Sequence, residues 1–67
     1  MHILSQSEKE TKFYADLIGF ETYKHISSAL DLRGVKRILR VGLWYLNPRI
    51  NEIMFYAGHN GIEITEV

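Results

Sequence analysis

Apolar residues in the first third of the chain recur at helical spacing. Pairs four residues apart give one apolar helix face, made by Phe13, Leu17, Tyr14 and Ile18. Ser7–Glu10 fits a capping box, in which a serine hydroxyl and a glutamate carboxylate bond to free amides of the first turn, and Ser5–Glu8 fits equally well. Gly19 suits a left-handed C-cap. We therefore predict a helix from about residue 7 to residue 18.

A second, shorter helix is predicted after Phe20. Thr22 is suited to its N-cap. Its buried stripe would consist of Tyr23, Ile26, Ala29 and Leu30. The segment 31–34 then interrupts the pattern, with Asp31 as a candidate N-cap for the next element and Gly34 as a turn residue.

The segment from Arg33 to Asn47 is ambiguous. On a helix, its apolar residues fall on one broad face, formed by Val35, Ile38, Leu39, Val41, Leu43, Tyr45 and Leu46. The helix could continue to Asn47, before Pro48, or end at Gly42 and be followed by a strand over 43–46, which we favour slightly. A strand over 36–46 fits poorly, because its polar and apolar residues do not alternate.

The last third is predicted to be β-structure. Residues 53–57 form an apolar run, and 62–64 alternate between apolar and polar. Asn60-Gly61 between them is a strong hairpin signal, because both residues tolerate positive φ. The prediction is thus a small single α+β domain over 1–67, with two or three N-terminal helices followed by a β-hairpin or small antiparallel sheet. This layout is that of a winged helix.

Composition narrows the class of protein. The chain has 67 residues, 46 % of them apolar, and no cysteine, which excludes disulfides and thiolate metal sites. No apolar run is long enough to cross a membrane, and no signal peptide is evident. We expect a cytoplasmic protein with no membrane partner. Because a domain this small is only marginally stable, homodimerisation is one expected route to stability.

The charges are segregated along the chain. Residues 1–32 carry three basic and five acidic side chains (3 − 5 = −2), residues 33–49 carry five basic ones (+5), and residues 50–67 carry three acidic ones (−3). A cationic segment in a neutral chain indicates either an acidic partner or internal pairing with the acidic segments.

The favoured function is a DNA-binding regulator that uses a basic recognition helix on duplex DNA. The candidate nucleic-acid-binding residues are Arg33, Lys36, Arg37, Arg40, His59 and Asn60. The last two would lie at the tip of the wing. The zero net charge counts against this function, and a solvated basic face is the plainer interpretation.

The alternative function is a protein-interaction module, such as a small inhibitor or adaptor. Trp44 and Tyr45 are the candidate partner-binding residues, because tryptophan beside arginine is enriched at interaction hot spots. A partner could also add a strand at a sheet edge. Packing beneath the predicted hairpin is the plainer explanation of Trp44.

No pattern indicates an enzyme, a cofactor or a metal site. The histidines, His2, His25 and His59, lack the close spacing of zinc ligands. Ser27 and Ser28 follow His25 closely, but a catalytic triad also needs an orienting group and an oxyanion hole. The five glycines are scattered and form no phosphate-binding loop.

Overall fold

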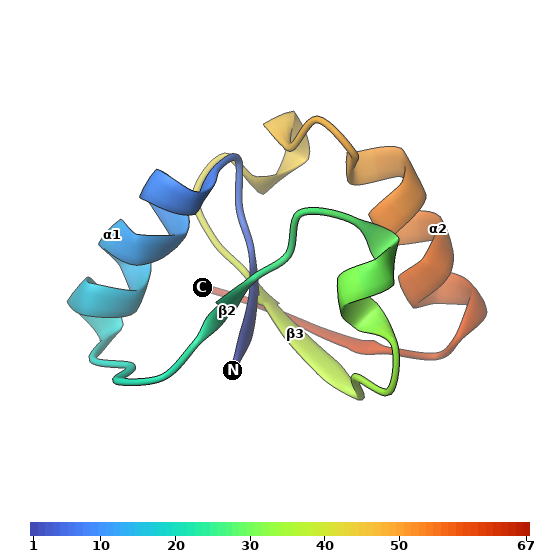
Figure 1. Ribbon diagram of the computed structural model, residues 1–67, viewed down its shortest axis with the longest axis horizontal. Helices are drawn as coiled ribbons and strands as arrows, with labels where there is room; N and C mark the ends of the chain where they lie inside the picture. The colour runs from blue at the N-terminus through green and yellow to red at the C-terminus, as the bar shows by residue number, and fades with distance from the viewer.

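A four-stranded, all-parallel sheet forms the centre of the molecule in the computed structural model, which describes residues 1–67 (Figure 1). Helices alternate with the strands. The elements in chain order are strand β1 (His2–Leu4), helix α1 (Glu8–Ile18), strand β2 (Lys24–His25), 3-10 helix η1 (Ala29–Leu32), strand β3 (Arg37–Arg40), 3-10 helix η2 (Trp44–Leu46), helix α2 (Ile50–His59) and strand β4 (Glu63–Glu66). The predicted arrangement, in which helices are followed by an antiparallel hairpin or small antiparallel sheet, is therefore wrong, and so is the winged-helix layout. None of the helices is long and apolar enough to cross a bilayer.

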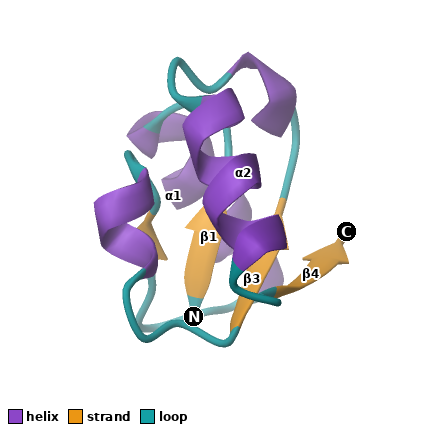
Figure 2. Cartoon of the chain, turned by 90° about the vertical axis from the view of Figure 1, so that its right-hand side faces the viewer, coloured by secondary structure: helices purple, strands orange, loops and turns teal.

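The strand order is β2-β1-β3-β4. Ile3 pairs with Leu39 between β1 and β3, and Arg37 pairs with Glu63 between β3 and β4. Because parallel neighbours need long crossover connections, α1 links β1 to β2 and α2 links β3 to β4. Figure 2 shows α2 lying across the sheet, with β4 at its outer edge.

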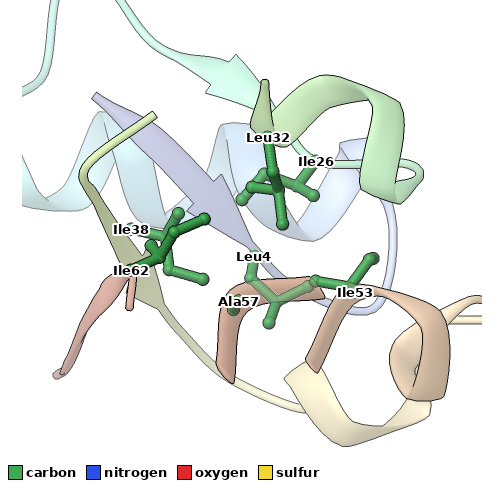
Figure 3. Packing of buried hydrophobic residues seen from close by; sticks show 7 residues of the cluster. All are labelled: Leu4, Ile26, Leu32, Ile38, Ile53, Ala57 and Ile62. Carbon is green, nitrogen blue, oxygen red and sulfur yellow. The ribbon is translucent and has the colours of Figure 1, made fainter. Parts of the chain in front are cut away.

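Each face of the sheet has its own apolar core. The larger core lies under α2 and η1, as Figure 3 shows, and consists of Leu4, Ile26, Leu32, Ile38, Ile53, Ala57 and Ile62. The smaller core lies under α1 and consists of Ile3, Ala15, Leu39 and Val41. Successive strand residues point to opposite faces, so the pairs Ile3-Leu4 and Ile38-Leu39 each supply both cores.

The first helix is as predicted. Ser7 is its N-cap, with an extended backbone and a side chain that accepts a hydrogen bond from the Glu10 amide. Gly19 closes the helix in the left-handed conformation at φ 101°, and its N–H bonds to the Ala15 carbonyl. The predicted inward face is mostly wrong, because Phe13, Leu17 and Ile18 are exposed and only Tyr14 packs against the smaller core.

The second predicted helix is wrong. Lys24 and His25 form an edge strand, because the amides of Lys24 and Ile26 donate to the carbonyls of Met1, just before β1, and Ile3 in β1. Ser28, and not Thr22, is a helix cap: its hydroxyl accepts from the Leu30 amide at the start of η1. Asp31 caps η1 as well, and does not begin a third helix.

The third predicted helix is a strand followed by a 3-10 turn. Ile38 and Leu39 are both buried because the sheet is covered on both faces at this point. Such a strand has consecutive apolar residues without alternation, which is why the periodicity suggested a helix. The predicted strand over 43–46 is η2, and Pro48 lies before α2 and stops no helix.

The predicted hairpin is wrong because its first strand is helical. Ile53 and Ala57 are buried four residues apart on one face of α2. The second strand exists as β4, but it pairs with β3 in parallel. Asn60-Gly61 does form a turn, in which Gly61 has φ 64°. This turn joins α2 to β4.

Replacing Gly61 by valine should lower the free energy of unfolding by more than about 1 kcal/mol, because a β-branched residue is strained at positive φ. A Cβ at this position would meet no atom within 4 Å, so the loss would report backbone strain alone. Urea unfolding measures it, with Gly61→Asn as the control, since asparagine tolerates this conformation. An unchanged midpoint for Gly61→Val would contradict the left-handed turn.

Candidate nucleic-acid interface

A hollow at the amino end of the sheet is lined by most of the basic residues that were predicted to bind nucleic acid. It has a volume of about 490 Å³ and lies where β2 and β3 begin. We call it the amino-end hollow; its ionisable lining residues are His2, Lys24, Asp31, Arg33, Lys36 and Arg37. Thus three of the four predicted basic residues lie together, although none of them is on a helix.

Local structure explains why these cations converge. Arg33 is the C-cap of η1, Lys36 lies in the loop just before β3, and Arg37 is the first residue of β3. All three are exposed and take part in no ion pair or side-chain hydrogen bond. Lys24 reaches them from β2, and its Nζ lies 4.0 Å from Asp31 Oδ1. The alternative interpretation, internal pairing with acidic segments, therefore does not account for Arg33, Lys36 and Arg37.

Asp31 is the one carboxylate in the hollow, and it accepts its hydrogen bonds from Ser27 and Ser28. Oδ2 accepts from the Ser27 amide at 2.8 Å, the Ser27 hydroxyl at 2.9 Å and the Ser28 amide at 3.2 Å. These hydrogen bonds lower the pKa of Asp31, and the bond from the Ser27 amide has the largest effect. Burial lowers the pKa of His2, so His2 adds no positive charge at neutral pH. The hollow then carries four cations against one anion (4 − 1 = +3).

His59 and Asn60 lie at the same end of the molecule but do not line the hollow. They end α2, which runs opposite to the strands and leads into β4. The His59 ring stacks on Phe55 with centroids 6.1 Å apart, and the Asn60 amide donates to the Tyr56 carbonyl. Both side chains are thus engaged with their own helix.

Arg40 lies at the opposite, carboxyl end of β3. Its guanidinium sits over the Trp44 ring, 4.2 Å from the centroid. Its Nε lies 3.0 Å from Glu66 Oε2, but the N–H is not directed at that oxygen, so the contact is an ion pair and not a hydrogen bond. Trp44 Nε1 donates to the same oxygen at 3.2 Å. Arg40 is therefore separated from the other predicted cations and is locally neutralised.

The two aromatic residues that were predicted to bind a partner, Trp44 and Tyr45, differ in their exposure. Trp44 is half-buried and packs against the larger core. Tyr45 is 54 % exposed and meets Trp44 edge to face. Leu43 and Leu46 are 42 % and 52 % exposed beside it. An exposed apolar group thus surrounds η2, with Tyr45 and not Trp44 as its aromatic side chain.

A second hollow, of about 580 Å³, lies between α1 and β2, and the sequence prediction missed it. We call it the helix-side hollow; it is lined by Glu8, Lys9, Lys12, Tyr23, His25 and Ser27, and it shares Lys24 and Asp31 with the amino-end hollow. Its residues come from α1, from β2 and its flanking residues, and from η1; α1 and the β2 segment were both predicted as helices, and only α1 is one. Nothing in their spacing along the chain shows that they meet.

His25 is held in this hollow by a buried chain of hydroxyls. Its Nδ1 lies 2.7 Å from Thr11 Oγ1, which lies 2.6 Å from Ser5 Oγ. Ser5 donates its only hydroxyl proton to the Ser7 carbonyl. Thr11 must then donate to Ser5, and His25 Nδ1 must donate to Thr11. Since burial lowers the pKa of His25, the neutral ring keeps its Nε2 lone pair free.

The usual ligand crevice of such a sheet is occupied by a side chain. In doubly wound sheets, ligands bind beyond the carboxyl ends of the strands where the connections reverse direction, here between β1 and β3. Glu10 fills this position: its carboxylate accepts from the Gln6 amide at 2.9 Å and from the Leu43 amide at 3.1 Å. The open, charged surface lies elsewhere, in the two hollows.

Comparison with known proteins identifies no relative: the chain matches no protein-family model, no curated protein and no solved structure. No three His, Cys, Asp or Glu side chains come together in a way that could hold a metal ion. Function therefore has to be inferred from the two hollows and the exposed group around η2.

Proposed function

We propose that this chain is a non-enzymatic domain that binds nucleic acid through its phosphate backbone, with the amino-end hollow as the contact surface. The observation that carries the proposal is the convergence of Arg33, Lys36 and Arg37, exposed and unpaired, with Lys24 in one hollow. Phosphate contacts by arginine and lysine supply most of the sequence-independent affinity and need no recognition helix.

The zero net charge of the chain limits the electrostatic contributions to this binding. Long-range attraction of a neutral protein to a polyanion is weak, so affinity should come from the few cations in direct contact. Arg40 is excluded from that set by its place at the carboxyl end. Four phosphate contacts then give a log–log salt slope of roughly −3 to −4, at about 0.7 to 0.9 per phosphate.

Replacing Arg33, Lys36 or Arg37 singly by alanine should shallow the salt slope by about one contact. Fluorescence anisotropy with labelled DNA, titrated at several salt concentrations, measures the slope. Arg49→Ala is the matched control, because Arg49 is also exposed but lies next to Glu52 at the other end of α2. Each variant should keep its free energy of unfolding within about 0.5 kcal/mol, as expected at exposed positions. Absence of binding near 50 mM salt, even at high micromolar protein, would refute the proposal.

A second candidate function is binding of a partner protein through the exposed group around η2. Leu43, Tyr45 and Leu46 support it, since contiguous exposed apolar side chains are typical of interaction sites. Tyr45→Ala is the variant that tests it, because Trp44 also packs against the core. If nucleic acid does not bind, a pull-down in which Tyr45→Ala loses a partner that the unmodified chain retains would favour this function.

A further inference from the structure

The two hollows meet at the edge strand β2. They share Lys24 and Asp31, so a ligand can pass from the amino-end hollow over β2 into the helix-side hollow. We propose that this continuous track binds a single-stranded nucleic acid, with phosphates on the cations and a base or sugar at Tyr23 and His25. The inference rests on the proposed function and specifies its ligand.

The shape of the surface favours one strand over a duplex. Contact with base edges in duplex DNA is commonly made by a helix or a two-stranded ribbon that enters the major groove. Here Arg33, Lys36 and Arg37 come from a 3-10 helix end, a loop and a strand end, and they line a hollow. A concave cationic track with an aromatic beside it is the usual arrangement for single strands.

The charge of the track suits a phosphate backbone along its whole length. The helix-side hollow adds Lys9 and Lys12 to the four cations of the amino-end hollow, and adds Glu8 to Asp31. The track therefore has six basic and two acidic side chains (6 − 2 = +4). Lys12 also pairs with Asp16, its Nζ 2.9 Å from Oδ2, so the strongest phosphate contacts should be at the amino end.

The edge of β2 offers a backbone donor as well. The Lys24 amide donates to the Met1 carbonyl at 2.9 Å, and the Ile26 amide donates to the Ile3 carbonyl at 3.0 Å. Amides alternate in direction along a strand, so the His25 N–H points away from the sheet. It can donate to a phosphate oxygen that passes over the edge.

Tyr23 and His25 supply contacts to the nucleoside. Tyr23 is 36 % exposed and lines the helix-side hollow, and every base can stack on an aromatic face. The hydroxyl chain through Thr11 and Ser5 leaves His25 Nε2 as an acceptor. An N–H of a base or the 2′-hydroxyl of a ribose can donate to this atom.

The test compares a labelled mixed-sequence single strand with the duplex of the same sequence by fluorescence anisotropy at about 50 mM salt. We expect the single strand to bind at least about tenfold more tightly, and Tyr23→Leu to weaken single-strand binding by about tenfold through loss of stacking. Tyr45→Leu is the control, as an exposed tyrosine at the opposite end. His25→Asn, which can still donate to Thr11 but lacks the Nε2 acceptor, should weaken single-strand binding a few-fold.

The outcomes separate this inference from the proposed function. If Arg37→Ala weakens binding but the duplex binds as tightly as the single strand, or Tyr23→Leu has no effect, the nucleic-acid function stands and the single-strand inference is wrong. If neither form of DNA binds, the proposed function fails first. Urea unfolding of Tyr23→Leu and His25→Asn confirms that each variant is folded before its affinity is interpreted.

Discussion

Replacing Gly42 by alanine should lower the free energy of unfolding by about 3 kcal/mol, a large part of the stability of so small a domain. Gly42 has φ 54°, and the left-handed region costs a residue with a Cβ about 1 to 2 kcal/mol. The new Cβ would also lie 2.6 Å from the Glu10 carboxylate and 2.8 Å from the Tyr14 ring. Both side chains would have to move.

Movement of Glu10 is costly because of what its carboxylate holds together. It accepts hydrogen bonds from Gln6 in the loop after β1 and from Leu43 in the loop after β3. Displacing it breaks these hydrogen bonds at a cost of roughly 0.5 to 1.5 kcal/mol, because the two amides are exposed and water can take the place of the carboxylate. The two loops at the carboxyl end of the sheet would then lose their shared anchor.

The matched control is Gly34→Ala. Gly34 also has positive φ, 77°, but a Cβ there would meet nothing within 4 Å, so its loss should be only about 1 kcal/mol. In a Glu10→Ala background, Gly42→Ala should cost about 1 kcal/mol less than in the unmodified chain, because the coupling to Glu10 is gone. Equal losses for Gly34→Ala and Gly42→Ala in urea unfolding would contradict the role of Glu10.

Local signals predicted the elements that they alone determine. The first helix was predicted correctly because its cap, Ser7, and its end, Gly19, depend on neighbours within one turn. Gly61 likewise has the positive φ that its turn requires. Both features follow from short-range sterics and hydrogen bonding, which a single sequence displays.

Elements decided by distant contacts were predicted wrongly. Lys24 and His25 are a strand only because the amides of Lys24 and Ile26 find acceptors in the carbonyls of Met1 and Ile3. The segment Arg37–Arg40 is a strand because its two apolar residues face different cores. Sequence periodicity cannot distinguish such a short, doubly covered strand from a helical turn. The hairpin signal failed for a related reason, since burial of Ile53 and Ala57 against the sheet makes the preceding run helical.

The part of the candidate site that was predicted consists of residues that are close along the chain, and the part that was missed depends on distant contacts. Arg33, Lys36 and Arg37 are close along the chain, so their convergence did not depend on the fold class. Arg40 is also close in sequence, but three residues along a strand place it at the other end of the sheet. His25, Tyr23 and the lysines of α1 come together only through the β1–α1–β2 connection, and no local pattern reveals that contact.

Replacing Asn47 by aspartate should destabilise the domain by about 3 to 5 kcal/mol at pH 7, enough to unfold much of the population. Asn47 is 3 % exposed. Its Nδ2 donates to the Ser5 carbonyl at 2.8 Å and to the Ile26 carbonyl at 3.2 Å, and its Oδ1 accepts from the Arg49 amide at 2.9 Å. An ionised aspartate would bury a charge against two carbonyls that need a donor.

The defect of Asn47→Asp should depend on pH in a defined direction. Burial and the facing carbonyls favour the protonated acid, so the pKa of the new carboxyl is raised in the folded state. Its stability is then greatest below the unfolded pKa, about 3.9, and falls as pH rises toward the raised folded pKa. The unmodified chain changes in the opposite sense through Asp31, whose lowered pKa makes stability fall as pH falls.

The measurement is therefore the difference in free energy of unfolding between variant and unmodified chain, from urea titrations at pH 4 and pH 7. Asn47→Ala is the control: it loses the same two donated bonds, at about 2 to 3 kcal/mol, but adds no titrating group, so its difference should stay constant with pH. A difference for Asn47→Asp that is small at both pH values would show that Asn47 does not join the ends of β1 and β2. A large difference that stays constant with pH would show instead that the carboxyl is hydrated, and that the loss comes from the missing donor alone.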